Sequence, residues 1–372
     1  MWNKITDITY IEYICYFPLR SKRKIANIVC YDAYTQTCTQ EKYIILCFLI
    51  LLNALKKCLE QSIHRIFGGA SRETYRVELK DEEEKTQNFI YRRSQDSSLI
   101  ETDQKTEYVA YSDFQDTEVP VPRLIVLEES SDKLGAPFLV MEELSGLVAS
   151  PFDKEAYCPH QAEIGEQFWK ILGKIAYHDL NSSNLGKLFP NKNKNNCYEK
   201  ELNYWVNVIR KDSIGIEPIL EAAIRELFRS KPLPASRLSI IHGDYRNGNF
   251  LFEGKHITGI LDWEMAHIGD PLEDLAWALS EIWCWEKKET PAYLIPREEA
   301  LDFWAKESKL EIDHDSLYWW ELFSCVKGLA IWISAGHEFL TNKNSDPVNL
   351  FSAWVPGDIH SEIILNKLES LL

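Results

Sequence analysis

The chain has 372 residues, of which 45% are apolar and 12 are tryptophan, so it can bury a sizeable core and is not intrinsically disordered. Its formal net charge of −16 argues against nucleic acid as a partner, because the phosphates would be repelled. Nine cysteines, an odd number without a CxxC pair, argue against zinc or a secreted disulfide framework and favour a reducing cytoplasm.

Residues 1–60 differ from the rest of the chain in charge. They carry eight Lys/Arg and five Asp/Glu, a net charge of +3, whereas residues 61–372 carry a net charge of −19. An apolar run begins at Tyr43 and ends at Leu55, shorter than the ~20 residues needed to cross a bilayer. We expect a helix that runs through Leu59 and packs on the following domain. A membrane-associating anchor and an unstructured leader are the alternatives.

Residues 63–79 predict two strands joined by a glycine turn, because polar and apolar residues alternate in the second half of this stretch. Gly68 and Gly69 allow a close approach of the backbone to phosphate groups, and Ser71 can donate a hydrogen bond to a phosphate oxygen. A Gly-Gly hairpin turn is also common without any ligand. The turn alone therefore leaves both interpretations open.

The next predicted strand, NFIYRRSQ, contains two consecutive arginines, Arg92 and Arg93. Side chains alternate between the two faces of a strand, so only one of the two can face a given cleft. A helix-like stretch that contains Glu107 follows. The segments RLIVLEES and PFLVMEE predict two more strands before Gly146, where the chain can bend away. A surface salt bridge is the alternative role of Glu107 and its arginine.

From Gln161 onward the sequence predicts mostly helices. The segment EQFWKILGKIAYHDL has apolar residues at i, i+3 and i+4, as in Phe168, Ile171 and Leu172, which is typical of a core-facing helix. Six tryptophans of the last third lie on similar patterns and predict core packing or the wall of an acceptor pocket: Trp283, Trp285, Trp304, Trp319, Trp320 and Trp332.

The stretch IIHGDYRNGNFLFEGKHITGILDWE carries the pattern with the most chemistry. Asp244 and Asn249 lie in a glycine-containing turn after a predicted strand, and Asp262 ends a second strand-like run after a predicted hairpin. A loop carboxylate can accept the proton of an attacking hydroxyl, while an amide oxygen and a second carboxylate can hold Mg²⁺. Asp and Asn beside Gly are also ordinary turn formers, but the strand context favours a catalytic loop followed by a metal site.

HGDYRNGNFLF followed by ILDWE resembles the aminoglycoside phosphotransferase family, a branch of the protein-kinase-like fold. With AHIGDPLEDLAW after the second Asp, the chain is similar to a narrower group, the kinase-like domains related to those fused to acyl-CoA dehydrogenases. The resemblance extends roughly over residues 63–340. It implies an α+β, two-lobed fold: an N-terminal extension over residues 1–60, a small β-rich lobe over 61–144, and a large helical lobe over 145–372.

The resemblance also implies roles for the catalytic residues. Asp244 is then the catalytic base, His242 braces its loop, and Arg246 lies beside the base in the catalytic loop. Asn249 and Asp262 are the Mg²⁺ ligands. The implied activity is transfer of the γ-phosphate of ATP to a hydroxyl group of a small molecule, with ATP and Mg²⁺ as cofactors.

Nucleotide binding is assigned by the same resemblance. Arg92 pairs with the phosphates and is fixed by Glu107, with Arg93 as the substitute if the strand register shifts by one. The glycine turn covers the phosphates, and an inter-lobe hinge meets the adenine. The residues in these roles are Gly68, Gly69, Ser71, Arg92, Glu107, Glu142 and Leu144.

Two acidic residues after the motif have structural interpretations. Asp270 is expected to cap a helix whose first residue is Pro271. Asp274, one turn later, is expected to support the catalytic loop through Arg246 or His242.

The acceptor is left open by the sequence. The narrower group favours a hydroxyacyl-CoA, although the acidity of the chain gives no support for an anionic thioester. An aminoglycoside, a choline-like alcohol or a sugar is the alternative within enzymes. A nucleotide-binding pseudokinase is the alternative of another class.

Overall fold

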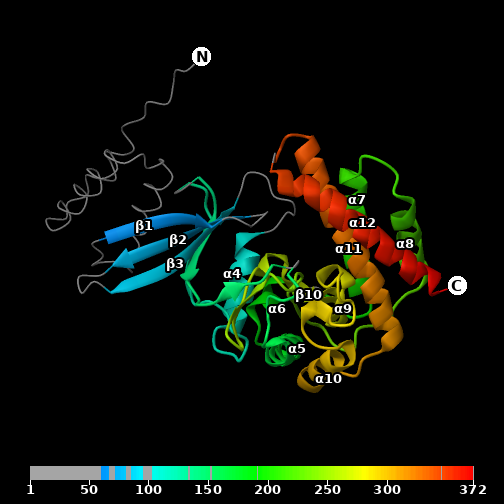
Figure 1. The fold of residues 1–372 in the computed structure, drawn as a ribbon, viewed down its shortest axis with the longest axis horizontal. Helices are drawn as coiled ribbons and strands as arrows, with labels where there is room; N and C mark the ends of the chain where they lie inside the picture. The colour runs from blue at the N-terminus through cyan, green and yellow to red at the C-terminus, as the bar shows by residue number, and fades with distance from the viewer. Residues whose placement is uncertain are drawn as a thin grey trace, which may run out of the picture.

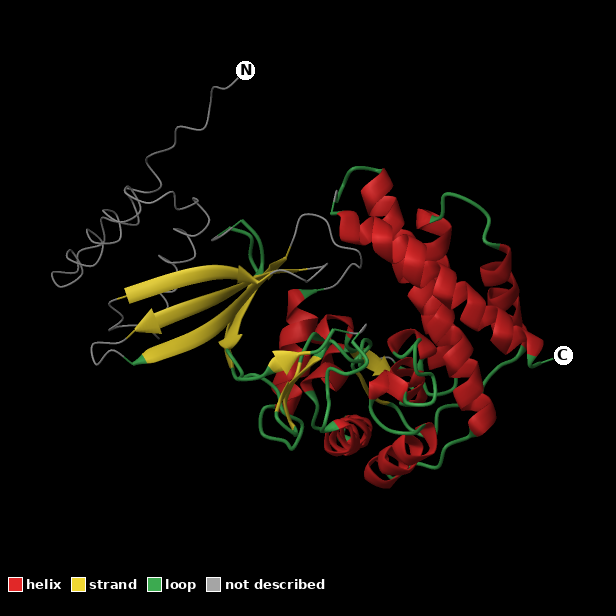
Figure 2. Ribbon diagram, viewed as in Figure 1, coloured by secondary structure: helices red, strands yellow, loops and turns green. Residues whose placement is uncertain are grey.

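The computed structural model describes residues 60–66, 72–80, 85–94, 103–132, 135–150, 153–190, 192–344 and 346–371. A strand-rich lobe and a helical lobe lie side by side (Figures 1 and 2), so the predicted α+β, two-lobed fold is confirmed. The apolar run from Tyr43 to Leu55 and the glycine turn with Gly68, Gly69 and Ser71 lie outside the described residues. Predictions about them, and the predicted domain boundaries, therefore stay predictions.

The small lobe is one antiparallel sheet with a helix against it. Its strands run in the order β1-β2-β3-β5-β4. The elements are β1 (Glu60–Ile66), β2 (Arg72–Lys80), β3 (Thr86–Ser94), α4 (Gln104–Phe114), β4 (Leu124–Glu128) and β5 (Phe138–Glu142). The predicted strand pair around the glycine turn is present, since β1 and β2 pair in antiparallel register.

Alternation along β3 sorts its side chains between the two faces of the sheet. Phe89 and Tyr91 join a small apolar cluster with neighbours from β2 and β5 on one face. Ile90 and Arg92 point to the opposite face, where Leu139, the register partner of Arg92 on β5, joins the main core beneath α4. The strand period therefore places Arg92, and not its neighbour, on the face that meets α4 and the large lobe.

The large lobe is mostly helical. Its helices are α5 (Gln161–Tyr177), α6 (Asn184–Leu188), α7 (Cys197–Asp212), α8 (Pro218–Arg229), α9 (Leu272–Leu279), α10 (Arg297–Ser308), α11 (His314–Leu340) and α12 (Pro347–Glu369). Its short strands are β6 (Leu147–Val148), β7 (Ser239–Ile241), β8 (Phe250–Glu253), β9 (His256–Ile260) and β10 (His267–Gly269). The 3-10 turns are η1 (Trp263–Met265), η2 (Glu281–Trp283) and η3 (Pro291–Tyr293).

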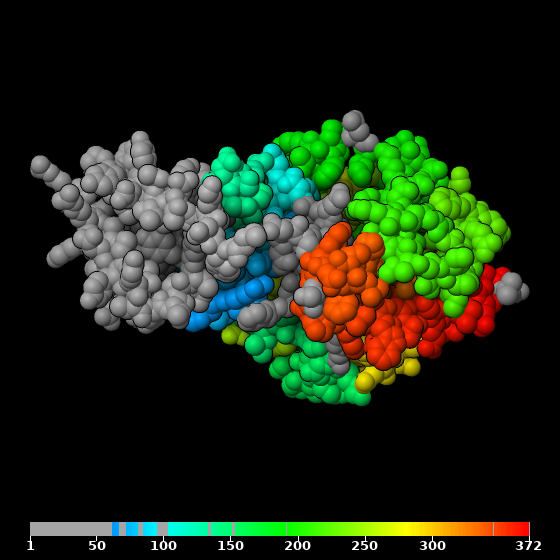
Figure 3. All heavy atoms as spheres, turned by 90° about the horizontal axis from the view of Figure 1, so that it is seen from above, coloured from blue at the N-terminus to red at the C-terminus, as the bar shows by residue number. Residues whose placement is uncertain are grey.

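Helix α11 is the central helix of the large lobe, because α7, α8, α9 and α12 all pack against it. Seen from above in Figure 3, the C-terminal helices in orange and red lie beside the green α7–α8 region. Trp283, Trp304, Trp319 and Trp320 are buried, whereas Trp285 and Trp332 are partly buried. The core-packing interpretation of these aromatic residues therefore holds for the first four.

Helix α5 carries the predicted apolar stripe, and Phe168, Ile171 and Leu172 are all buried. A glycine lets it approach α10 closely: a Cβ on Gly173 would lie 2.8 Å from the carbonyl oxygen of Trp304. Any larger residue there would push the two helices apart.

Helix α9 begins one residue later than predicted. Pro271 occupies the N-cap position and Leu272 is the first helical residue. Asp270 still stabilises the first turn, since its Oδ1 accepts from the N–H of Leu272 at 3.0 Å and its Oδ2 from the indole of Trp320 at 3.3 Å.

Across the part of the chain that the structure describes, no helix is both long enough and apolar enough to cross a membrane.

Candidate active site

The loop that follows β7 holds the carboxylate of Asp244 with three donors. Asn249 Nδ2 lies 2.6 Å from Asp244 Oδ2, and the indole Nε1 of Trp277 lies 2.8 Å from Oδ1. Arg246 Nε donates to Oδ1 at 3.0 Å. The side chain of Asp244 keeps 16% of its surface exposed, so the carboxylate is fixed in direction yet still reachable.

Asn249 joins this loop to the next one. Its Nδ2 also donates to the backbone carbonyl of Asp244 at 2.9 Å, and its own carbonyl accepts from the N–H of Leu261 at 2.8 Å. Because Nδ2 makes both side-chain bonds, Oδ1 is the atom of Asn249 that would meet a cation. The adjacent residue after Leu261 is Asp262, so the two expected Mg²⁺ ligands are tied together through backbone.

Asp262 stands two residues after the end of β9 in a left-handed backbone conformation, with φ 66° and ψ 56°. Asp is one of the few residues that tolerate this region, which turns the chain sharply at the end of the strand. Its N–H donates to the hydroxyl of Tyr111 on α4 at 3.0 Å. The turn thus presents the Asp262 carboxylate towards the small lobe.

Arg92 spans from the small lobe to Asp262. Its Nη1 lies 2.5 Å from Glu107 Oε1, and its Nη2 lies 2.7 Å from Asp262 Oδ1. The predicted pairing of Arg92 with Glu107 is confirmed, while Arg93 instead pairs with Glu73 on β2. Burial raises the pKa of Asp262. The charge of Arg92 and its hydrogen bond lower this pKa by more than burial raises it, so the pKa lies below its usual value.

A second buried arginine that the sequence analysis missed stands behind this pair. Arg72 Nε lies 3.4 Å from Glu264 Oε2 and 3.8 Å from Glu107 Oε2. Glu264 comes two residues after Asp262, so its carboxylate is carried by the same turn. Burial and the nearby charge of Asp262 raise the pKa of Glu264 to about 8. The only local signal for this contact was a Glu in the ILDWE segment.

His242 is fully buried beneath the loop. Its Nε2 lies 2.9 Å from the carbonyl of Leu261, and its Nδ1 lies 3.2 Å from the N–H of Asp244. Burial lowers the pKa of His242 to about 4, so the ring is neutral and these contacts require the proton on Nε2. This geometry agrees with a bracing role, because the ring contacts the backbone of Leu261 and Asp244.

Asp274 on α9 holds the backbone of the same loop. Its Oδ2 accepts from the N–H of His242 at 2.6 Å and its Oδ1 from the N–H of Gly243 at 2.9 Å. Of the two expected routes, the contact is through the backbone of His242 and not through Arg246. Burial raises the pKa of Asp274 to about 6 against these two hydrogen bonds, which lower it.

Arg246 lies over an aromatic ring at the edge of the site. Its guanidinium carbon is 4.7 Å from the ring centroid of Trp283, and its Nη1 donates to the carbonyl of Asn247 at 2.9 Å. Of the two tryptophans that contact the charged residues of the loop, Trp283 was expected as core packing or as the wall of an acceptor pocket, and Trp277 was not singled out by the sequence analysis. Their place in the chain, shortly after the motif, is the one signal that could have marked them.

The expected hinge residues lie where the chain passes between the lobes. Strand β5 ends at Glu142, and Glu143 donates its N–H to the carbonyl of Asn88 at 3.1 Å. After Leu144, whose side chain packs against Gly259 of β9, the chain enters β6, which pairs with β8 of the large lobe. Adenine contacts at Glu142 and Leu144 stay a prediction.

A charged cluster lies behind the catalytic loop. His267 Nε2 is 3.1 Å from Glu273 Oε2 and 3.8 Å from Glu201 Oε1, and its Nδ1 lies 3.0 Å from the carbonyl of Met265. A His and two Glu are the donor types of a metal site. However, Lys327 Nζ already lies 3.3 Å from Glu273 Oε1, so a cation occupies this position. We therefore interpret the cluster as a network of ion pairs.

The cluster predicts a pH dependence of stability. Burial lowers the pKa of His267, but the charges of Glu201 and Glu273 outweigh it and raise the pKa to about 9. Since the unfolded value is about 6.5, the stabilisation is complete below that pH and is lost as pH rises through about 9. We expect the difference in melting temperature between the natural chain and His267→Asn to shrink between about pH 6 and about pH 9.5. The exposed His256→Asn is the control, and a constant difference would contradict the ion pairs.

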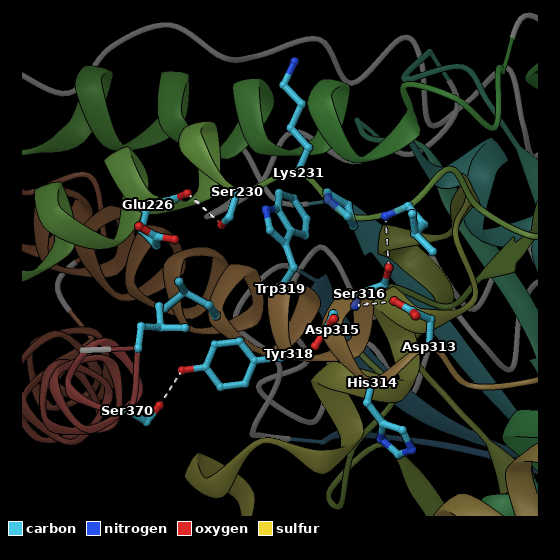
Figure 4. Close-up of a pocket in the computed structure, with 14 residues that line it drawn as sticks. Glu226, Ser230, Lys231, Asp313, His314, Asp315, Ser316, Tyr318, Trp319 and Ser370 are labelled. Carbon is cyan, nitrogen blue, oxygen red and sulfur yellow. Dashed lines mark hydrogen bonds between the residues drawn. The ribbon is translucent and has the colours of Figure 1, made fainter.

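One pocket, of about 630 Å³, lies away from the catalytic loop. Figure 4 shows it between the end of α8, the start of α11 and the end of α12. Two of its polar groups bond within the chain: Ser316 Oγ accepts from the N–H of Leu233, and Asp313 accepts from the N–H of Ser316. None of the predicted site residues that the structure describes lines it.

Several known proteins are similar to this chain. The phosphotransferase enzyme family model matches residues 62–312. Acyl-CoA dehydrogenase family member 10 of Mus musculus is 25% identical over 215 residues, covering 56% of this chain and 19% of that protein. Family member 11 of Rattus norvegicus is 24% identical over 207 residues, covering 54% and 26%. The chain thus spans about a fifth to a quarter of the length of these two relatives.

Solved structures share the fold. The crystal structure of a Ralstonia eutropha JMP134 protein described as an aminoglycoside phosphotransferase has a TM-score of 0.67 to this chain at 19% identity. The match covers 84% of this chain and 93% of that chain. The GDP complex of aminoglycoside 2'-phosphotransferase-IIIa has a TM-score of 0.57 at 12% identity, covering 88% and 99%. At these identities the likeness shows the two-lobed kinase-like fold alone.

Proposed function

The chain belongs to the phosphotransferase enzyme family, and we propose that it transfers the γ-phosphate of ATP to a hydroxyl group of a small molecule. The observation that carries the proposal is the meeting of four side chains from both lobes. Asp244 and Asn249 share a hydrogen bond in one loop, and Arg92 reaches from the small lobe to Asp262 in the next. A proton acceptor, two oxygen ligands and a phosphate-binding cation are the parts that phosphoryl transfer requires.

In this proposal Asp244 orients the acceptor hydroxyl and accepts its proton as the bond to phosphorus forms. The three donors on its carboxylate keep one rotamer, so the oxygen is held in place before the acceptor arrives. Arg246, 22% exposed and next to the base, adds positive charge where negative charge develops on the transferring phosphoryl group. The proton leaves the acceptor oxygen for Asp244, and ADP carries away the bonding electron pair.

The residues present fit a magnesium ion. Asn249 Oδ1 and the Asp262 carboxylate are hard oxygen donors on two loops that share the Asn249–Leu261 hydrogen bond. Asp262 is ionised in this environment, since its pKa is lowered. When bound, Mg²⁺ would neutralise phosphate charge and align the nucleotide. Asn249 and Asp262 are the residues that would hold it.

Arg92 is proposed to bind the α- and β-phosphates. Its present partner Asp262 would then turn to the metal, while Glu107, fully buried, keeps the guanidinium in the cleft. Gly68, Gly69 and Ser71 are proposed to cover the phosphates, and Glu142 and Leu144 to border the adenine. Solved structures of the fold include complexes with ADP and with GDP, which supports a nucleotide in this cleft.

The acceptor is proposed to be a hydroxyacyl-CoA. Support comes from the matched relatives, which are named acyl-CoA dehydrogenase family members. The alternatives are an aminoglycoside, a choline-like alcohol or a sugar. Viomycin phosphotransferase of Streptomyces vinaceus is 40% identical over 60 residues, covering 15% of this chain and 21% of that protein, and one solved structure holds hygromycin B. We propose a cytoplasmic location, in which cysteines stay reduced.

A phosphate-transfer screen tests the proposal. Labelled ATP and Mg²⁺ are incubated with hydroxyacyl-CoAs, aminoglycosides, amino alcohols and sugars, and the phosphorylated product is identified. Transfer to one class establishes both the activity and the acceptor. Nucleotide binding without transfer to any class would instead favour a pseudokinase, against which the presence of base and both metal ligands argues.

Residues 1–60 are proposed to be dispensable for nucleotide binding, because they lie outside the family match and differ in charge from the rest. We expect a chain shortened to begin near Glu60, where β1 starts, to stay soluble and bind ATP like the full chain. The measurement is calorimetric titration of both chains. Aggregation or loss of ATP binding would show that the removed segment is an integral part of the small lobe.

A further inference from the structure

A buried lysine outside every sequence motif reaches the catalytic loop. Lys327 lies in the middle of α11 with 1% of its surface exposed. Its Nζ donates to the carbonyl oxygen of Gly243 at 2.6 Å and pairs with Glu273 Oε1 at 3.3 Å. The ammonium also lies over the ring of Trp277, 5.0 Å from its centroid. Burying an ammonium is costly, so a lysine here needs the partners that surround it.

The carbonyl that Lys327 holds belongs to the peptide that leads into the base. Gly243 has φ +86°, and a Cβ at this position would collide with the backbone of Met265, so only glycine fits. A glycine backbone is also the easiest to rotate. Because the carbonyl of Gly243 and the N–H and Cα of Asp244 share one rigid peptide plane, fixing that carbonyl fixes the position from which the Asp244 side chain extends.

Among the groups of this loop, the carbonyl of Gly243 is the one that α11 binds. Asp274 holds the N–H groups of His242 and Gly243 from α9, and Trp277 holds the Asp244 carboxylate from the same helix. Lys327 supplies the remaining contact from a second helix and ties α9 to itself through Glu273. The two helices therefore hold the groups on either side of the Gly243–Asp244 peptide, whose own N–H donates to His242 Nδ1 and whose carbonyl accepts from Lys327.

We propose that Lys327 is a positioning residue for phosphate transfer, which holds the Gly243–Asp244 peptide so that the Asp244 carboxylate meets the acceptor hydroxyl. This inference rests on the proposed function for its catalytic consequence. The geometric part, that Lys327 orders the loop, stands independently of any acceptor.

The test replaces Lys327 with methionine, which keeps the chain length and removes the donor. We expect kcat to fall on the order of 100-fold, as for a misplaced reacting group, with the KM for ATP changed less than about twofold. Amide hydrogen exchange over residues 239–249 should become faster. The matched control is Lys367→Met. Lys367 on α12 pairs with Glu321 on α11, the helix that carries Lys327, at 2.9 Å, but it lies away from the loop. It should lower the melting temperature without changing kcat or exchange in the loop.

In the single variant Glu273 keeps His267 as a partner but loses Lys327 at Oε1. The double variant Lys327→Met with Glu273→Gln removes the charge left at that oxygen. It should regain melting temperature but not kcat, since the Gly243 carbonyl still lacks its donor. If the single variant does not fold, the double variant gives the result. Unchanged kcat and unchanged loop exchange in a folded variant overturn the inference. If the natural chain transfers phosphate to no acceptor, the proposed function fails, and loop exchange alone still decides the role of Lys327.

Discussion

Replacing Asp244 with asparagine is expected to reduce phosphate transfer on the order of 10³-fold while nucleotide affinity stays nearly unchanged. The substitution keeps the shape of the side chain, and Trp277 Nε1 can still donate to the remaining oxygen, now 2.8 Å away. What is lost is the negative oxygen that accepts the proton of the acceptor hydroxyl. The metal ligands Asn249 and Asp262 remain, so the nucleotide should bind as before.

The measurement combines kcat with calorimetric titration of ATP in the presence of Mg²⁺. Asp116→Asn is the matched control, because Asp116 is exposed and lies after α4, outside the site. It should change neither quantity. Turnover of Asp244→Asn at the level of the natural chain would remove the base assignment, and a loss of ATP affinity would show that Asp244 mainly supports the fold.

Asp262→Ala is expected to weaken Mg²⁺-dependent nucleotide binding on the order of 100-fold or more, because second-sphere changes at metal sites already cost 10–100-fold. Asp262 presents its carboxylate at the turn after β9, where Arg92 also reaches. Removing it takes away a hard oxygen ligand and leaves the Arg92 charge with Glu107 alone. The loss should therefore depend on the Mg²⁺ concentration.

Asp274→Ala is expected to lower the stability of the fold and to leave Mg²⁺-dependent nucleotide binding unchanged. It leaves the N–H groups of His242 and Gly243 buried without their acceptor, at about 1–3 kcal/mol each. The melting temperature should fall by roughly 5–10 °C, while the Mg²⁺ dependence of ATP binding is kept. Calorimetric titrations at several Mg²⁺ concentrations, with thermal unfolding of both variants, distinguish the two residues. A metal site that depends on Asp274 and not on Asp262 would mean that the ligands are misassigned.

Local sequence patterns were sufficient for the elements that carry the site. The strand before the catalytic loop, the antiparallel pair around the glycine turn and the apolar stripe of α5 all follow from spacing within fewer than about 18 residues. The pairing of Arg92 with Glu107 was expected only from the resemblance. The strand period alone left Arg92 and Arg93 equivalent until the packing of α4 showed which face meets the cleft.

By itself, the sequence determined the spacing of Asp244, Asn249 and Asp262, because catalytic loops and hairpins are specified by neighbouring residues. The two-lobed fold was expected from the family resemblance that this motif carries. Only the tertiary structure decided what orients these residues. Lys327 meets Gly243 across 84 positions of sequence, and Tyr111 meets Asp262 across 151. Such contacts depend on how whole helices pack. The residues around a buried lysine or tyrosine in a helical pattern do not indicate which distant loop it will contact.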